Sequence, residues 1–356
     1  MGSLLQSFQK KESKVDLRDL TVDEIKVYLQ EIGEKPFRAK QIFKWIHKSI
    51  EDIDDMSDLS KDLREKLKKD AYICNMNIVG KMESKVDGTI KYLMSMKDGN
   101  VIECVFMKYK HGNSICISTQ AGCRMGCTFC ASTIGGKNRD LTAGEMIGQI
   151  LKVQLDTGEN ISNIVLMGTG EPFDNYDNVM KFLSLVNSGD GINIGMRHIT
   201  ISTCGLVPEI KRLADDNNQV TLAISLHSPY DEARKQIMPI ARKYSLDELM
   251  EACRYYINKT SRRITFEYSL IDGVNDHREF AEELIRLLSG MLCHVNLIPI
   301  NQVKERDYKK SNKKRVDEFK SVLERGGIST TVRRELGSDI DAACGQLRRQ
   351  YLNKLD

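Results

Sequence analysis

The sequence lacks the long apolar segments on which membrane proteins depend. No run of eighteen apolar residues occurs, and Met1–Lys11 does not show a signal-peptide pattern. Hydrophobic residues make up 41% of the chain and charged residues 29%, which is the balance of a soluble globular protein. We therefore expect a cytoplasmic protein without a membrane segment. Its 356 residues suffice for one large core with an appended module, or for two domains.

Disulfide spacing is also missing, although the chain has ten cysteines. Half of them are scattered without a framework pattern, namely Cys74, Cys104, Cys204, Cys253 and Cys293. In a long chain without a secretion signal, clustered cysteines more often bind a metal or act in catalysis. The cysteine pattern therefore agrees with a reducing compartment.

One close group of cysteines lacks a fourth member nearby. Cys123, Cys127 and Cys130 have the spacing C-x₃-C-x₂-C. Structural zinc usually takes four protein ligands in two separated pairs. Three thiolates suit a four-iron cluster that is held at three irons, with the fourth iron open to another ligand. A non-catalytic RNA-binding protein with structural zinc remains an alternative, as does a plain electron carrier.

A large excess of charge is absent, because the net charge is only +3. The distribution is uneven, however. Basic residues crowd the segment Lys304–Arg315, and Arg333, Arg334, Arg348 and Arg349 follow near the C-terminus. Such patches suit a phosphate backbone, but a solvated loop and helix face would have the same composition.

Helical periodicity marks the N-terminal part of the chain from Leu17 to about Lys69. Thr21 and Glu24 form a capping-box pattern at the start of the first helix. Further helices are predicted over Pro36–Ile50 and Asp58–Lys69. Trp45, the only tryptophan, is interpreted as a core residue of this small helical module.

The hydrophobic period then changes to two. Ile90–Lys97 and Val101–Phe106 predict a hairpin that turns at Asp98–Asn100. Ser114–Ser118 predicts another strand, which ends just before Cys123.

Strands and helices alternate beyond Cys130. The predicted strands are Asn163–Met167, His198–Thr203, Val220–Leu226, Arg263–Ile271, His294–Ile300 and Ser329–Val332. The predicted helices are Ala143–Leu155, Asn175–Asn187, Pro208–Asp215, Asp231–Met238, Leu246–Lys259, His277–Leu288 and Lys314–Glu324. This alternation predicts a parallel sheet and an α/β fold class, as a partial (β/α)6 barrel with a small N-terminal all-helical accessory domain. The expected segments are residues 1–75 (accessory domain), 76–108 (β-hairpin connector), 109–336 (barrel) and 337–356 (C-terminal tail).

Candidate ligand-binding residues follow the predicted strands directly. They are Gly170 and Glu171, Ser202, the run Ser225, Leu226 and His227, and Asn301. Each position alone is as well explained by a turn. Together they are better support for a site, because the carboxyl ends of barrel strands meet at one mouth.

The cysteine spacing, the turn Gly170-Glu171-Pro172 and the tail Ile340-Asp-Ala-Ala-Cys344-Gly-Gln-Leu resemble one enzyme family over nearly the whole chain. They are similar to the radical S-adenosylmethionine (SAM) enzymes, and within them to the RlmN/Cfr family of RNA methyltransferases. The resemblance implies that Cys123, Cys127 and Cys130 hold one [4Fe–4S] cluster. It assigns SAM contacts to Gly170, Glu171, Ser202, Ser225, Leu226, His227 and Asn301.

The resemblance also implies a second cysteine system. Cys344 would accept a methyl group from a first SAM, and a second SAM would be cleaved to a radical that activates this methyl group. The carbon would then join C2 of an adenine. Glu103 would take the C2 proton as general base, and Cys116 would release the RNA, leaving a transient Cys116–Cys344 disulfide.

The implied partners are 23S ribosomal RNA and certain transfer RNAs, with an external electron donor such as flavodoxin or ferredoxin, and the protein is expected to be a monomer. Lys304–Arg315 and the N-terminal helices are candidates for binding RNA. The nearest alternative is the sister group that methylates C8 of the same adenine and confers antibiotic resistance. Gly170-Glu171-Pro172-Phe173 and Arg263–Tyr268 look more like the C2 group.

Overall fold

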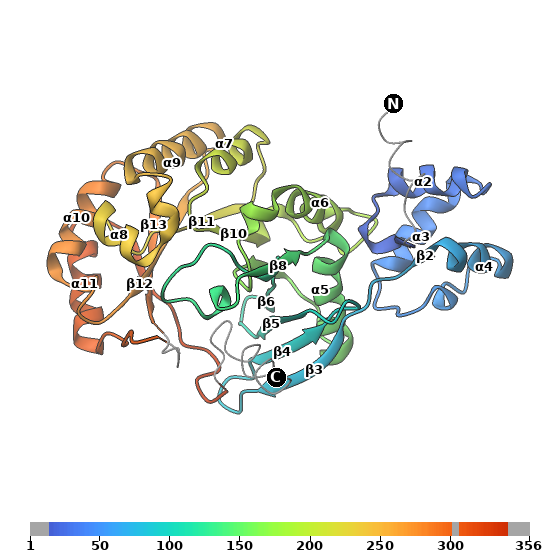
Figure 1. Cartoon of the computed structure of the whole chain (residues 1–356), viewed down its shortest axis with the longest axis horizontal. Helices are drawn as coiled ribbons and strands as arrows, with labels where there is room; N and C mark the ends of the chain where they lie inside the picture. The colour runs from blue at the N-terminus through green and yellow to red at the C-terminus, as the bar shows by residue number, and fades with distance from the viewer. Residues whose placement is uncertain (1–13, 301–305, 341–356) are drawn as a thin grey trace.

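A ten-stranded sheet forms the centre of the molecule in the computed structural model, which describes residues 14–300 and 306–340 (Figure 1). The strand order is β14-β13-β12-β11-β10-β9-β6-β5-β4-β3. Seven neighbouring strands run parallel, from β6 to β14, and they follow one another in chain order. This winding without a switch of direction confirms the predicted barrel-type fold.

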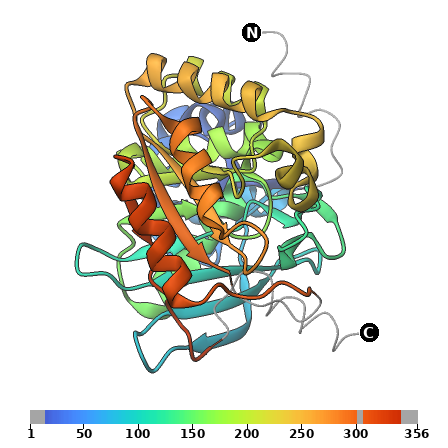
Figure 2. The same cartoon turned by 90° about the vertical axis from the view of Figure 1, so that its left-hand side faces the viewer.

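The parallel strands are β6 (Ser114–Cys116), β9 (Asn163–Leu166), β10 (Ile199–Thr203), β11 (Thr221–Ser225), β12 (Ile264–Leu270), β13 (Cys293–Pro299) and β14 (Thr330–Val332). The connecting helices are α5 (Ala143–Thr157), α6 (Tyr176–Asn187), α7 (Val207–Asp215), α8 (Asp231–Ile237), α9 (Leu246–Thr260), α10 (Arg278–Leu288) and α11 (Lys313–Arg325). All these elements were predicted, with ends within two residues of those found. Figure 2 shows α10 and α11, in orange and red, outside the strands that they connect.

The two faces of the parallel strands differ in chemistry. In β10, Ile199 and Ile201 are fully buried in the main core, whereas Thr200 and Ser202 point to the opposite face and are half-buried. Because side chains alternate along a strand, the helices cover the apolar face and leave polar side chains for the interior of the barrel. The strand-end site therefore lies on the inner face.

Three antiparallel strands extend the sheet beyond β6. They are β3 (Asn77–Glu83), β4 (Ile90–Ser95) and β5 (Val101–Met107). The predicted hairpin with its turn at Asp98–Asn100 is confirmed, because β4 and β5 pair directly. These strands belong to the same sheet as the parallel strands, so their side chains can contribute to the same inner face.

The N-terminal module contains α2 (Val22–Glu31), α3 (Ala39–Ile46) and α4 (Lys61–Asp70). Thr21 and Glu24 form the expected capping box at the start of α2. A short parallel pair, β1 (Val15–Asp16) with β2 (Ala71–Tyr72), adds to the helices and joins the beginning of the module to its end. Trp45 packs against the core, as expected, but it is only half-buried and donates a hydrogen bond to Asp58.

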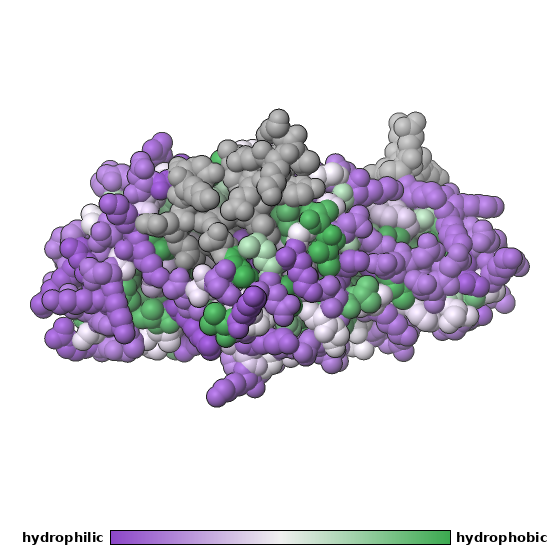
Figure 3. Space-filling view, turned by 90° about the horizontal axis from the view of Figure 1, so that it is seen from below, coloured by the Kyte–Doolittle hydropathy of each residue, from purple (hydrophilic) through white to green (hydrophobic). Residues whose placement is uncertain are grey.

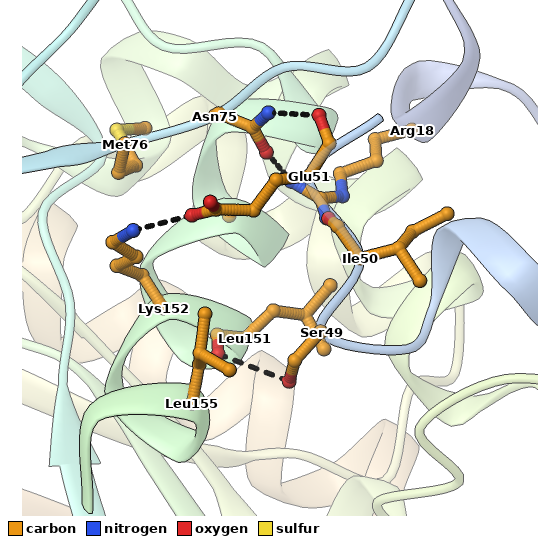
Figure 4. Close-up of a pocket in the computed structure, with 10 residues that line it drawn as sticks. Arg18, Ser49, Ile50, Glu51, Asn75, Met76, Leu151, Lys152 and Leu155 are labelled. Atoms are coloured by element: carbon orange, nitrogen blue, oxygen red, sulfur yellow. Dashed lines mark hydrogen bonds and ion pairs between the residues drawn. The ribbon is translucent and has the colours of Figure 1, made fainter. Parts of the chain in front are cut away.

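Side chains of the module bind directly to α5 of the barrel. Asp19 accepts a hydrogen bond from the backbone N–H of Gly144 over 2.9 Å, in the first turn of α5. An acidic side chain is favourable there because a helix N-terminus carries partial positive charge. Farther along α5, Ser49 donates to the carbonyl oxygen of Leu151, and Lys152 forms an ion pair with Glu51 (Figure 4).

Candidate active site

A short hairpin encloses the cysteine stretch. It consists of β7 (Gln120–Gly122) and β8 (Lys137–Asp140), and the backbone N–H of Cys123 donates to the carbonyl oxygen of Gly136 over 2.9 Å. Gly122 has a φ of +84°, and a Cβ there would lie 2.1 Å from the Gly136 oxygen, so only glycine fits. The sequence did not predict this hairpin. Both ends of the cysteine loop are therefore fixed.

The three cysteines differ in how deeply they are buried. Cys123 and Cys127 are buried, and Cys130 is half-buried. Thr133 fixes the backbone between them, because its hydroxyl donates to the carbonyl oxygens of Cys127 and Cys130. Burial raises the pKa of the Cys123 thiol to about 12, and the pKa of Cys127 rises for the same reason. Such thiols become thiolates only when a bound cation stabilises the negative charge.

The donor set fits an iron–sulfur cluster better than a single ion. Among residues 14–300 and 306–340, no three His, Cys, Asp or Glu side chains converge closely enough to hold one metal ion. A four-iron cluster binds each thiolate through a different iron, so its ligands surround a larger object. Cys123, Cys127 and Cys130 are three soft donors on one loop, which is the chemistry that such a cluster requires.

The loop packs against the connection that follows β11. The backbone N–H of Thr128 donates to the carbonyl oxygen of Ile237 over 2.9 Å. The rings of Phe129 and His227 meet edge to face, with centroids 4.8 Å apart. These contacts bring the cysteine loop and the predicted strand-end residue His227 to one place.

The turn after β9 is shaped for close approach of a ligand. Gly170 has a φ of +114°, and a Cβ there would lie 2.8 Å from the Thr119 hydroxyl. The hydroxyls of Thr119 and Thr169 are buried and have no hydrogen-bond partner within the described residues. Buried polar atoms normally have partners, so these hydroxyls are candidates to contact a ligand.

Glu171 connects two neighbouring strand ends. One carboxylate oxygen accepts a hydrogen bond from the N–H of Phe173 over 3.0 Å, and the other from the N–H of Cys204 over 2.8 Å. Burial raises the pKa of Glu171, and these two hydrogen bonds oppose the rise. A carboxylate has lone pairs beyond these two bonds, so the expected contact with an amine stays a prediction.

Ser202 and Ser225 are half-buried on the inner face, and Leu226 is fully buried. Ser225 lies directly beside Glu267 of β12 in the strand register. Glu267 is buried and accepts a hydrogen bond from Asn296 over 2.8 Å. The sequence argument missed this acid, although a glutamate inside the apolar strand Ile264–Leu270 was the available indication.

His227 has an unusual backbone and a defined ring orientation. Its φ is +59°, which is uncommon for a residue other than glycine, and Asn275 donates to its carbonyl oxygen. Its Nδ1 accepts a hydrogen bond from the N–H of Ser269 over 2.9 Å, so the ring proton sits on Nε2. Burial, assisted by the nearby Arg234 cation, lowers the pKa of His227 to about 3. The ring is therefore neutral at physiological pH and can donate from Nε2.

Arg234 is a second residue that the sequence argument missed. This guanidinium on α8 is fully buried. It donates to the carbonyl oxygens of Leu226 (3.1 Å), Cys204 (2.8 Å) and Ser225 (3.3 Å). It therefore joins the ends of β10 and β11 beneath the cysteine loop. A charged residue on a short helix normally indicates a solvated face, so its sequence gave no sign of this role.

Cys116 and Glu103 also share the inner face. Cys116 pairs with Val105 of β5, which pairs with Lys91 of β4, so these three residues form one row across three strands. Glu103 precedes Val105 by two residues and projects from the same face. Diagonal neighbours of this kind lie roughly 7–8 Å apart. We call Lys91, Glu103 and Cys116 the inner-face group; all three are buried.

The start of the C-terminal tail is held by the turn between β3 and β4. Asp339 accepts hydrogen bonds from the Ser84 hydroxyl over 2.6 Å and from the Lys85 N–H over 2.9 Å. In return, Asp87 accepts from the N–H of Gly337 over 2.9 Å. We call these contacts the tail clamp. Leu336 packs against the small cluster of Val105, Met107 and Cys116. The predicted site residues Cys344 and Asn301 lie outside the described residues.

The basic segment is partly neutralised by acids. Lys310 forms an ion pair with Glu335 at 2.8 Å, and Arg315 with Asp276 at 2.9 Å. Lys309, Lys313 and Lys314 are exposed.

Figure 3 shows a face whose two ends are largely hydrophilic, with hydrophobic side chains gathered near the middle. No helix in the described part of the chain has the length and apolar character needed to cross a membrane.

Comparison with known proteins agrees with this geometry. Residues 15–73 match the ribosomal RNA large subunit methyltransferase N-terminal domain, and residues 117–287 match the radical SAM superfamily. A probable dual-specificity RNA methyltransferase RlmN of Clostridium novyi is 60% identical over 95% of this chain and 98% of its own. This chain belongs to the RlmN family of radical SAM RNA methyltransferases. The family resemblance predicted from the motifs is thus confirmed.

Further RlmN relatives lead to the same conclusion. The Clostridium perfringens (strain SM101) protein is 59% identical over 95% of this chain and 97% of its own. A solved radical SAM methyltransferase from Sphaerobacter thermophilus is 44% identical, with a TM-score of 0.89 over 93% of this chain and 98% of its own. As a family member, the chain is a SAM-dependent methyltransferase with a 4Fe–4S cluster.

Proposed function

We propose that the chain methylates C2 of an adenosine in 23S rRNA, at the peptidyl transferase centre, and of an adenosine next to the anticodon in some tRNAs. The observation that carries this proposal is the inner-face group. Glu103 and Cys116 lie on neighbouring strands at one face of the sheet, separate from the cysteine loop. An acid and a thiol in addition to a cluster site suit methyl transfer through the protein itself. The names of the relatives support RNA as the substrate class.

The cysteine loop and the strand ends would hold the cofactors. Cys123, Cys127 and Cys130 would bind one [4Fe–4S] cluster, and two SAM molecules would be used in each turnover. When bound, the cluster supplies the electron that cleaves SAM to a radical. Gly170, Glu171, Ser202, Ser225, Leu226, His227 and Asn301 would bind and orient SAM; the Nε2–H of His227 and the hydroxyls of Thr119 and Thr169 are the donors best placed by burial.

The remaining residues would carry the methyl group and complete the transfer. The Cys344 thiolate takes a methyl group by displacement, and its carbon later becomes joined to C2 of adenine. Glu103 then accepts the C2 proton, and the electron pair of the C–H bond returns to the ring. Cys116 loses its thiol proton and forms a bond to the Cys344 sulfur while the carbon–sulfur bond to RNA breaks. The electron pair of that bond goes to the carbon, which takes a proton to complete the methyl group. Product release leaves a disulfide, which an external reductant must restore to two thiols.

The protein would work as a cytoplasmic monomer that receives electrons from a flavodoxin or ferredoxin. Its target base would be unstacked from the RNA to reach the barrel interior. Two rival activities predict different products: the C8 group would give 8-methyladenosine, and a zinc-containing RNA-binding protein would give no product.

Nucleoside mass spectrometry tests the proposal. The chain is expressed in cells that lack their own adenine-C2 methyltransferase, and rRNA and tRNA are digested separately. We expect 2-methyladenosine in both pools, and none with Cys344→Ala. Detection of 8-methyladenosine instead would assign the chain to the sister activity. An unmodified RNA pool, together with zinc rather than iron in anaerobically purified protein, would overturn the proposal.

A further inference from the structure

A buried ion pair lies within the inner-face group. Lys91 Nζ is 3.2 Å from Glu103 Oε2, and the two side chains are 0% and 4% exposed. Lysine is almost never fully buried unless it is paired. The residues come from adjacent strands, β4 and β5, where they are diagonal neighbours in the antiparallel register.

Burial of this ion pair among apolar neighbours is energetically unfavourable. Leu93 lies opposite Glu103, Val105 opposite Lys91, and all four side chains share one face. Taking two charges out of water costs several kcal/mol for each ion. Replacing such a pair with apolar residues of similar volume is often neutral or stabilising. Sheet stability alone therefore does not explain the pair.

The location of the pair suggests a chemical role instead. Lys91, Val105 and Cys116 form one row across β4, β5 and β6. Val165 of β9 continues this row toward the turn that carries Gly170. The ion pair thus lies on the same face as the thiol expected to release the product.

We propose that Lys91 is the positioning residue of Glu103, holding its carboxylate oriented to accept the C2 proton. This inference rests on the proposed function. An ammonium group at this distance forms a charge-assisted hydrogen bond that fixes the carboxylate in place.

The proton balance is simple. The covalent RNA adduct carries one hydrogen at C2, and Glu103 takes it as a proton. Glu103 becomes a neutral carboxylic acid, while Lys91 keeps its charge throughout. Without the ammonium group, the carboxylate loses the charged partner that fixes its position, so it is no longer held where it can accept the C2 proton.

Lys91→Met tests the proposal, because it removes the charge and keeps most of the volume. Steps before proton removal do not use Glu103, so iron content and the extra methyl group on Cys344, read by intact mass, should match the wild type. The covalent protein–RNA adduct should accumulate, and product formation should fall by about 10²-fold, the lower range for a lost general base. Lys91→Arg should recover product to within about tenfold of wild type.

Lys91→Gln gives a second route if the methionine variant does not fold, because the amide can still donate to Glu103. It should accumulate adduct in the same way. The neutral pair Lys91→Met with Glu103→Gln serves as a folding control, since it leaves no unpaired buried charge. Normal product release by Lys91→Met or Lys91→Gln, or parallel loss of Cys344 methylation and product, would overturn the positioning role.

The same assay separates this inference from the proposed function. If the wild type forms no 2-methyladenosine and Cys116→Ala traps no adduct, the proposed function has failed. If both behave as expected and the Lys91 variants release product at the wild-type rate, only the positioning role has failed.

Discussion

The cysteine loop and the inner-face group are built from the sequence in different ways. The loop is one continuous stretch, Cys123–Cys130, fixed at its ends by a two-stranded hairpin. The inner-face group is assembled from β4, β5 and β6, and its members are 25 residues apart from Lys91 to Cys116. A site formed by one continuous segment can be recognised from the spacing of its residues in the sequence. A site assembled from several strands can be recognised only once the register of those strands is known.

The electrostatics of the two regions also differ. Near the loop, the buried cation Arg234 donates to backbone carbonyl oxygens. In the inner-face group, a buried cation is balanced by the carboxylate of Glu103. The first arrangement leaves positive charge close to the thiol of Cys127. The second places a carboxylate and an ammonium group side by side in an apolar part of the sheet.

The largest expected effect separates the two regions by the step at which turnover stops. Cys127→Ala should remove iron and product, and no covalent protein–RNA adduct should form. Cys116→Ala should retain iron and trap the adduct, because its thiol is needed only for release. Both variants should lose at least about 10³-fold in product formation, since each removes a participating group. Iron analysis and denaturing gels with labelled RNA would measure the difference.

Cys344→Ala is the matched control for this comparison. It should retain iron like Cys116→Ala but form no adduct, like Cys127→Ala. Free, unmodified RNA with Cys116→Ala would contradict its resolving role. Cys253→Ala, a buried cysteine in the helical layer, should leave both readouts unchanged.

Much of the fold and the loop could be predicted from sequence. The alternation of strands and helices fixed the order of the parallel sheet, because sequential βα units pack beside one another. Ser202, Ser225 and His227 lie at or beside the carboxyl ends of their strands, as expected, because parallel strands place these ends at one edge. Their contacts with SAM stay a prediction.

What could not be predicted depended on burial of charge. Lys91 and Arg234 are fully buried, whereas lysine and arginine are normally expected at the surface. The local sequence pattern does not reveal a buried cation whose partner is brought close only by the tertiary fold. The strands β7 and β8 were missed for a related reason: they are short, and Lys137–Asp140 is entirely polar. The partial neutralisation of the basic segment could not be predicted either, because the acids that pair with Lys310 and Arg315 are distant in sequence.

Arg234→Met is expected to have an intermediate effect on stability. It tests whether the hydrogen bonds from Arg234 to backbone carbonyl oxygens stabilise the region near the cysteine loop. The variant removes a cation and leaves three buried carbonyl oxygens at the ends of β10 and β11 without this donor. We expect the free energy of unfolding to fall by about 3 kcal/mol, from the cost of unpaired buried polar groups. Denaturant titration of the iron-free protein measures this without involving the cluster.

Arg212→Met is the control for that experiment. Arg212 is an exposed arginine on α7 that forms an ion pair with Asp177. Surface pairs contribute at most about 1 kcal/mol, so this variant should be nearly neutral. Equal destabilisation by the two substitutions would show that the carbonyl contacts of Arg234 are unimportant.

The smallest effect concerns the tail clamp, which connects the inner-face side of the sheet to the segment before Cys344. Partial burial acts to raise the pKa of Asp87, but hydrogen bonds from the N–H groups of Gly337 and Thr89 outweigh it and hold the pKa at about 2. The pKa of the folded state is thus below the ordinary value of about 3.9. The stabilisation is complete above pH 4 and is lost as the pH falls toward 2.

Asp87→Ala should therefore lower the free energy of unfolding by about 1 kcal/mol at pH 7. Below about pH 4, the difference between variant and wild type should shrink, because the wild-type carboxylate becomes protonated. Denaturation midpoints between pH 7 and pH 3 measure this difference. Glu83→Gln, an exposed position on the neighbouring strand β3, should show no such trend. A difference that stays constant to pH 3 would mean that the charge of Asp87 does not hold the clamp, and the start of the tail would then depend on Asp339 and Ser84 alone.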